Sequence, residues 1–185
     1  MDTSTWVVLG IAGAVVLWLI ATYNRLVSLR NQAQNAWAQI DVQLKRRHDL
    51  IPNLVEVVKD AMGYEQETLK QVVEARNAAV AAKGPAEVGV AEARLTQATT
   101  QLFALMENYP QLKANDNVMQ LQEELTTTEN KIAFARQFYN DSIMGANNMV
   151  QSFPANLIAG TFGFTTMAHL DIPEAERAVP KVNLR

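Results

Sequence analysis

The sequence predicts an all-α protein, in which an N-terminal transmembrane helix continues into an antiparallel, up-and-down four-helix bundle. Residues 5 to 23 carry no charged side chain. Apolar residues then recur every three or four positions as far as residue 61, and three further stretches with helical spacing follow. Between residues 24 and 151 no run alternates apolar and polar side chains between turn residues, so we expect no strand there.

The apolar stretch from Thr5 to Tyr23 is long enough to cross a bilayer, since about 19 residues at 1.5 Å per residue give roughly 28 Å. Trp6 and Tyr23 flank it, at the headgroup level that aromatic rings prefer. The alternative is a cleaved signal peptide, which needs basic residues before the apolar run, whereas Asp2 is the one charged residue there. The run also ends in a bulky tyrosine instead of a small-residue cleavage site. Residues 1 to 23 are therefore predicted to be an anchor.

Basic residues indicate the orientation of this anchor. Those nearest to the predicted span all follow it, and none precedes it: Arg25, Arg30, Lys45, Arg46 and Arg47. Cytoplasmic flanks of transmembrane helices carry an excess of Lys and Arg. We therefore expect a single-pass protein of the cell membrane, with its N-terminus outside and its C-terminal domain in the cytoplasm.

The bundle is expected over residues 24 to 152, with helices at about 24 to 62, 65 to 83, 86 to 109 and 115 to 152. The first helix has a seam with the a/d spacing of a coiled coil: Ala33, Trp37, Ile40, Leu44, Arg47, Ile51, Leu54, Val58 and Ala61. Pro52 should bend this helix without ending it, because the seam continues beyond it, and Gly63 is the expected end. Short connections make neighbouring helices antiparallel.

Arg47 is the one charged residue on this seam. Counting residues along antiparallel helices brings other charged side chains to its level, which predicts a polar layer made of Arg47, Asp49, Arg76, Glu92, Arg94 and Glu129. Buried charges are tolerated when they are paired, so the layer is interpreted as an ion-pair network that fixes the helix register, with a ligand or partner site as the alternative. Lys45 and Arg46 are expected in solvent, roughly 33 Å of helix from Tyr23 and too far to bind lipid.

The segment from Phe153 to Phe164, FPANLIAGTFGF, is strongly apolar. The same count along the helices returns it to the level of Asn24, at the bilayer surface. It is too short to span, so we expect it in the membrane interface, against another subunit, or folded as a cap over the end of the bundle. Residues 153 to 185 are predicted to be this segment followed by an irregular tail.

A two-helix stalk is predicted where residues 30 to 40 pair with residues 139 to 150, beyond the reach of the second and third helices. Two helices cannot bury apolar side chains on all sides, and exposed apolar surface of this kind marks an interface, so we expect a homo-oligomer. The candidate membrane and oligomer contacts are Trp37, Tyr139, Ile143, Val150, Phe153, Leu157, Ile158, Phe162 and Phe164.

No catalytic, cofactor-binding or metal-binding residues are predicted. The chain has no cysteine, and neither of its two histidines, His48 and His169, follows a glutamate at the spacing of di-metal bundles or belongs to an HExxH motif. No serine lies in a nucleophile-elbow frame. A net charge of −3 argues against a nucleic-acid partner. We therefore expect no enzymatic activity.

The run from Tyr23 to Lys59, YNRLVSLRNQAQNAWAQIDVQLKRRHDLIPNLVEVVK, resembles the signature of the LemA family. Further matches extend over nearly the whole chain after the anchor: Glu65, Ala75 to Asn77, Tyr109 to Leu112, Leu121, Glu124, Glu129 to Ile132, Arg136, Tyr139, Asn140, Phe153, Pro154 and Phe162 to Phe164. The resemblance implies a membrane-anchored four-helix bundle with no established enzymatic activity, and a membrane zinc metalloprotease as a possible partner.

These observations lead to two hypotheses about function. The first is an oligomeric scaffold or adaptor at the cytoplasmic face of the membrane, whose partners are the lipid bilayer, further copies of the chain and other membrane proteins. The alternative is a homo-oligomeric coat that shapes or organises the membrane itself.

Overall fold

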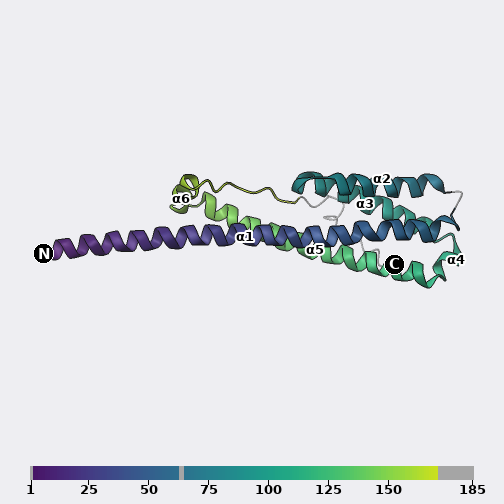
Figure 1. Cartoon of the computed structure of the whole chain (residues 1–185), viewed down its shortest axis with the longest axis horizontal. Helices are drawn as coiled ribbons and strands as arrows, with labels where there is room; N and C mark the ends of the chain where they lie inside the picture. Colours follow the sequence, from purple (N-terminus) through teal and green to yellow (C-terminus); the bar gives the residue numbers. More distant parts are fainter. Residues whose placement is uncertain (1, 63–64, 171–185) are drawn as a thin grey trace, which may run out of the picture. The chain divides into compact units, whose positions relative to one another are not determined.

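The computed structural model describes residues 2 to 62 and 65 to 170, and every regular element in these ranges is a helix (Figure 1). The helices are α1 (Thr3–Lys59), α2 (Gln66–Ala81), α3 (Gly84–Met106), α4 (Pro110–Lys113), α5 (Asp116–Gln151) and α6 (Ala155–Thr161). The all-α prediction is confirmed for this part of the chain. The expected helix end at Gly63 and the tail from residue 171 lie outside the described residues.

Helix α1 is one long helix that begins in the apolar stretch and continues through the predicted seam. Its N-terminal part is long and apolar enough to cross a membrane, and almost none of that part is buried. Pro52 lies inside α1, so the prediction that the helix does not stop there is confirmed. The seam prediction is confirmed as well, since most of its side chains are buried: Ala33, Ile40, Leu44, Arg47, Ile51, Leu54 and Val58.

The chain divides into two compact units. Unit 1 contains the residues up to Ala38 together with Gln137–Ala168, and unit 2 contains Gln39–Arg136 together with the chain from His169. Parts of α1 and α5 belong to each unit.

Unit 2 has a hydrophobic core to which five helices contribute. α2 and α3 lie side by side (Figure 1), joined by a tight turn in which Gly84 takes a positive φ of 74° that favours glycine. The buried core residues are Ile51, Leu54, Val58, Met62, Leu69, Val72, Ala79, Ala91, Leu95, Ala98, Leu102, Met106, Leu112, Val118 and Leu125. Each fully buried Leu, Ile or Val in this set stabilises the fold by about 1.5 to 3 kcal/mol.

Helix α5 begins where a side chain can cap it. The Asn115 side-chain oxygen accepts hydrogen bonds from the backbone N–H groups of Asn117 and Val118, at 3.0 and 3.3 Å. These N–H groups have no partner within the helix, because the first turn lacks preceding carbonyls. The cap explains why a helix starts here, five residues after Pro110.

Unit 1 is built from α1, α5, α6 and the extended residues that follow α6. Asn147 on α5 binds the backbone of Met167 in both directions: its amide nitrogen donates to the Met167 carbonyl at 2.9 Å, and its side-chain oxygen accepts from the Met167 N–H at 2.8 Å. The Tyr139 hydroxyl donates to the Ala168 carbonyl at 3.1 Å. Burial raises the pKa of the Tyr139 phenol.

The prediction of an uncovered two-helix stalk is wrong. Ile143 has 0% of its surface exposed, Tyr139 is buried, and Trp37 and Val150 are half-buried. One reason is that the chain after α6, which was expected to be an irregular tail, binds α5 through Asn147 and Tyr139. The Trp37 and Tyr139 rings also pack on each other. Exposed stalk residues therefore give no support to an oligomer.

The apolar segment from residue 153 also has regular structure that was not predicted. Residues 155 to 161 form the short helix α6. Ala155, Ile158 and Ala159 are its buried residues, and Ile158 and Ala159 pack with Leu26 of α1 in a small hydrophobic cluster. This contact fixes one face of α6 against the helix that carries the apolar N-terminal stretch.

Candidate functional site

The first candidate site is an exposed apolar surface around α6, here called the α6 surface and made of Phe153, Leu157 and Phe162. These side chains have 79%, 64% and 62% of their surface exposed. An aromatic or leucine side chain left in water loses the stabilisation of about 1.5 to 3 kcal/mol that burial would give. Three such side chains on one short segment therefore indicate a surface that contacts something apolar.

The α6 surface lies beside the end of the apolar stretch of α1. The ring of Phe162 packs edge-on against the ring of Tyr23, with 4.9 Å between centroids, and Phe164 packs on the same tyrosine at 5.8 Å. Tyr23 is the last residue of the predicted span. The predicted return of this segment to the level of the span's end is therefore confirmed within unit 1.

The structure separates the nine predicted contact residues into two groups. Phe153, Leu157 and Phe162 are exposed. The other six are buried or half-buried within the chain, which leaves less of their surface for an outer contact: Trp37, Tyr139, Ile143, Val150, Ile158 and Phe164. Ile158 is occupied by Leu26, and the Trp37 and Tyr139 rings pack on each other at 5.2 Å.

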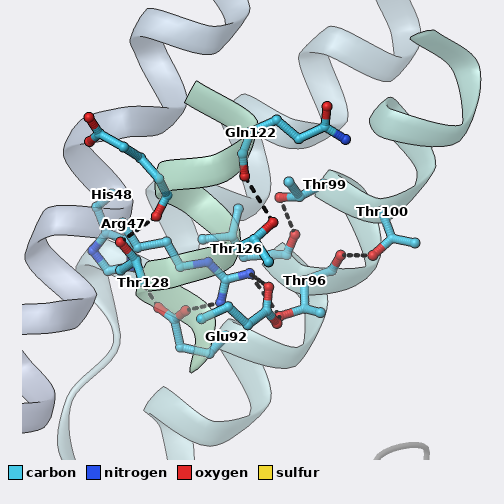
Figure 2. Close-up of polar contacts among 12 residues, drawn as sticks. Arg47, His48, Glu92, Thr96, Thr99, Thr100, Gln122, Thr126 and Thr128 are labelled. Atoms are coloured by element: carbon cyan, nitrogen blue, oxygen red, sulfur yellow. Dashed lines mark hydrogen bonds and ion pairs between the residues drawn. The ribbon is translucent and has the colours of Figure 1, made fainter. Parts of the chain in front are cut away.

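The second candidate site is a buried polar cluster in unit 2, here called the Arg47 cluster and made of Arg47, His48, Glu92, Thr96 and Glu129. Figure 2 shows the first four of these residues. Arg47 Nη1 donates to Glu92 Oε2 at 3.1 Å, and Nη2 donates to Thr96 Oγ1 at 2.9 Å. The Arg47 and Glu92 side chains are only 4% and 8% exposed. A buried pair of this kind contributes to stability only as a pair, because either charge alone would be left desolvated.

His48 and Glu129 complete the cluster. His48 Nε2 lies 2.6 Å from Glu92 Oε1. Nε2 is the donor of this hydrogen bond in the tautomer that carries the ring proton there, since a carboxylate oxygen only accepts. Glu129 lies 3.5 Å from Arg47 Nη2 and accepts from the Thr96 hydroxyl at 3.2 Å, but its side chain is half in solvent, so its pairing is weaker.

Arg76 supplies the hydrogen bond that the His48 carbonyl loses because residue 52 is a proline. In an α-helix the N–H of residue 52 would donate to the carbonyl of His48, and proline has no N–H. Arg76 Nε, on α2, donates to this carbonyl at 3.1 Å instead. Arg76 on α2 thus compensates for the hydrogen bond that Pro52 removes from α1.

The predicted polar layer is only partly formed. The structure brings Arg47, Glu92 and Glu129 together and places Arg76 on the His48 backbone. Asp49 and Arg94 are exposed on the outer surface, so their inclusion was wrong. The prediction did not include His48 and Thr96. His48 could have been found from the sequence, because it directly follows Arg47 and lies four residues before Pro52.

The space beside the Arg47 cluster is too small for a ligand. A cavity of about 20 Å³ is lined by Arg47, Glu92, Thr96, Glu129, Arg136 and apolar residues of unit 2. This volume holds about one water molecule. Buried threonines nearby bond to carbonyls of their own helices, as Thr99 does to Leu95 and Thr128 to Glu124, both at 2.7 Å (Figure 2). The dimensions favour a structural network over a binding pocket.

Comparison with known proteins matches this helical chain to one family. A sequence profile described as the LemA family matches residues 36 to 184. The chain belongs to the LemA family. Within the part of this LemA-family chain that the structure describes, no three His, Asp or Glu side chains form a group that could hold a metal ion.

Curated relatives are similar over most of the chain. Protein LemA of Metamycoplasma hominis is 25% identical over 158 residues, which cover 83% of this chain and 71% of the relative. Magnetosome protein MamQ of Magnetospirillum gryphiswaldense is 23% identical over 177 residues, covering 82% of this chain and 65% of the relative. Magnetosome protein MamQ 2 of Paramagnetospirillum magneticum gives the same figures. This LemA-family chain thus spans about two thirds of the length of the MamQ proteins.

We expect Arg47→Ala to lower the free energy of unfolding by about 3 to 5 kcal/mol, because it leaves the buried Glu92 carboxylate without its cation. Replacing both residues, as in Arg47→Met with Glu92→Met, should recover most of this loss. Denaturant melts of the full chain in detergent measure both. Arg46→Ala is the matched control, since Arg46 is exposed in its pair with Glu124, and should cost less than about 1 kcal/mol. Equal losses for the two arginines would contradict the buried pairing.

A second prediction concerns the His48 carbonyl. Arg76→Met should cost about 1 to 3 kcal/mol in the natural chain, because it leaves this carbonyl without a donor. The cost should be clearly smaller in a Pro52→Ala background, where the restored amide donates to the same carbonyl. Urea melts of the four variants form a double-mutant cycle. Arg94→Met removes an exposed arginine and should change stability by no more than about 0.5 kcal/mol. If the free-energy changes of the Arg76 and Pro52 substitutions were additive, Arg76 would not be the donor that replaces the missing amide of residue 52.

Proposed function

We propose that this LemA-family protein is a non-enzymatic, single-span membrane protein that serves as a scaffold at the membrane surface. Two contacts hold it there: the apolar N-terminal part of α1 crosses the bilayer, and the α6 surface enters the interface beside it. The packing of Phe162 on Tyr23, with Phe153, Leu157 and Phe162 exposed, is the observation that carries this proposal.

The energy of the second contact supports its role. Moving three large apolar side chains from water into the interface contributes roughly 4 to 9 kcal/mol as an upper estimate. α6 is too short to span, and its other face is already occupied by Leu26. A short segment with one face on the protein and the other apolar and exposed matches an interfacial contact.

The orientation follows from the residues directly after the span. Arg25 and Arg30 flank Tyr23 on the side of α6, and basic flanks face the cytoplasm. We therefore place the N-terminus outside and unit 2 in the cytoplasm.

The scaffold itself is proposed to be an antiparallel four-helix bundle of α1, α2, α3 and α5. The shared core of unit 2 and the short connections between its helices support this arrangement. In it, the Arg47 cluster fixes the register, because a helix that slipped by one turn would separate Arg47 from Glu92.

Other proteins and further copies of the chain are the proposed partners. Val42 is a large apolar side chain exposed on unit 2, although a single exposed residue is weak support. Relatives that are named for a cellular structure, the magnetosome, and not for a reaction support a structural role. A membrane protease is a further candidate partner through the family resemblance.

Single-cysteine labelling tests the α6 contact. The chain has no cysteine, so Leu157→Cys can carry one environment-sensitive fluorophore in the full-length protein in liposomes. We expect a blue-shifted emission, protection from a water-soluble quencher, and quenching by lipids that carry a spin label, because the side chain lies in the interface. A label at Phe134→Cys on unit 2 should report water in all three measurements.

The same labels separate the alternatives. Protection from the soluble quencher without quenching by the labelled lipids would assign the α6 surface to another subunit. An emission at position 157 equal to that at position 134 would reject the interfacial contact.

A membrane-shaping coat is the second candidate function. The α6 surface favours it, because a side-chain cluster inserted into only one leaflet expands that leaflet relative to the other. Many copies on one membrane would then bend it.

Electron microscopy of the purified protein in liposomes discriminates the two functions. Ordered coats on narrow tubes or small vesicles, lost in the Phe153→Ser, Leu157→Ser double variant, are the outcome expected of a coat. Small discrete particles on vesicles of unchanged diameter are expected of a scaffold.

A further inference from the structure

Unit 1 contains a cavity next to the α6 surface that neither proposed function uses. Its volume is about 230 Å³. Its lining consists of Leu26, Arg30 and Gln34 from α1, Ala146 and Val150 from α5, and Gly163, Phe164, Thr165 and Met167 from the chain after α6. Pockets for drug-sized ligands start at about 300 Å³, so this cavity fits a group such as a lipid headgroup.

The guanidinium of Arg30 stacks on the ring of Phe164, and this contact leaves its N–H donors available. Its guanidinium carbon lies 5.3 Å from the centroid of the Phe164 ring. Stacking on an aromatic ring uses the face of the guanidinium and leaves its N–H groups, which lie in the plane, free to bind an anion. The ring thus positions an Arg fork, the geometry that matches two oxygens of a phosphate.

The other lining groups agree with an anionic ligand that has an apolar part. Gln34 lies one turn after Arg30, and it and Thr165 supply further polar groups. Leu26, Val150 and Met167 form apolar walls. Among the described residues that line the cavity, none carries a carboxylate, so nothing there repels a negative charge.

The height of Arg30 along α1 suits a lipid phosphate. Arg30 lies seven residues after Tyr23, or roughly 10 Å of helix. The headgroup layer extends about 5 to 8 Å beyond the hydrocarbon. Helical side chains point back toward the N-terminus, so the guanidinium reaches toward this layer.

We propose that this cavity binds the phosphate of an anionic phospholipid, with the stacked Arg30 guanidinium as the charged contact and with Leu26, Val150 and Met167 against the start of the lipid chains. This inference rests on the proposed membrane anchoring. A soluble phosphate would use the same donors but would gain nothing from the apolar walls, so we commit to the lipid.

Thermal unfolding of the full-length protein in an uncharged detergent tests the site. Phosphatidylglycerol at a hundredfold excess over its Kd should raise the unfolding midpoint by roughly 5 to 10 °C, whereas phosphatidylcholine should raise it much less. Arg30→Gln should remove most of this shift. Arg25→Gln is the matched control, because Arg25 is exposed and nearer to the span but does not line the cavity, and it should keep the shift.

Arg30→Lys separates a built site from attraction of charge. Lysine keeps the positive charge but loses the planar fork and the stacking on Phe164, so the shift should fall well below that of the natural chain. Native mass spectrometry of the same samples should find one retained phosphatidylglycerol that is absent in Arg30→Gln.

Three results would overturn the proposal: equal loss of the shift in Arg25→Gln and Arg30→Gln, a full shift in Arg30→Lys, or the same shift with inorganic phosphate as with phosphatidylglycerol. The last would assign the cavity to a soluble phosphate. The titration uses detergent and not a bilayer, so a negative result rejects only the lipid site. The contact of the α6 surface with the membrane is tested separately, by the label at position 157.

Discussion

Each backbone carbonyl of α1 that is shielded from water needs a hydrogen-bond donor, and the rest of the structure is arranged around this constraint. Lipid offers no water to bond a free carbonyl, and the apolar part of α1 contains no proline that would free one. In unit 2 a proline is tolerated because another helix supplies the missing donor. The Arg76 side chain on α2 thus lies where α1 lacks a hydrogen-bond donor. The packing of α2 beside α1 and the completion of the hydrogen bonds of α1 therefore depend on each other.

The two units solve the problem of buried polarity in different ways. Unit 2 buries an ion pair and surrounds it with threonines that bond to their own helices, so the charges are few and each has a partner. Unit 1 buries no ion pair among its described residues and instead uses neutral side chains, Asn147 and Tyr139, to bind the backbone of an extended segment. Neutral groups cost less to desolvate than charges, which suits the proposed position of unit 1 next to a bilayer.

Sequence patterns predicted the long elements well and the short ones poorly. The seam of α1 was found because its period extends over about eight turns, which outweighs the two residues that interrupt it, Arg47 and Pro52. α6 was missed because seven residues are too few to show a period, and its stability comes from Leu26, far away in the sequence. The extended residues 163 to 168 show no pattern at all, since their partners are side chains of α5.

The errors in the polar layer have a geometric origin. Counting 1.5 Å per residue gives the height of a side chain along a bundle but not the direction in which it points. Asp49 and Arg94 have the right height and the wrong direction, as two residues along a helix turn the side chain by about 200°. Arg47, Glu92 and Glu129 have the right height and also point toward one another. Counting residues along the helices therefore finds the level of the polar layer, but it also includes residues at that level that point into solvent.

The late position of Met167 in the chain has a consequence for biosynthesis. α5 is complete on the ribosome before its extended partner exists, and about 20 residues separate Asn147 from the backbone group that it binds. At about 5 to 20 residues per second, the Asn147 side chain stays without this backbone partner for roughly 1 to 4 s. During that interval, its amide can bond to water or to other polar groups of the nascent chain.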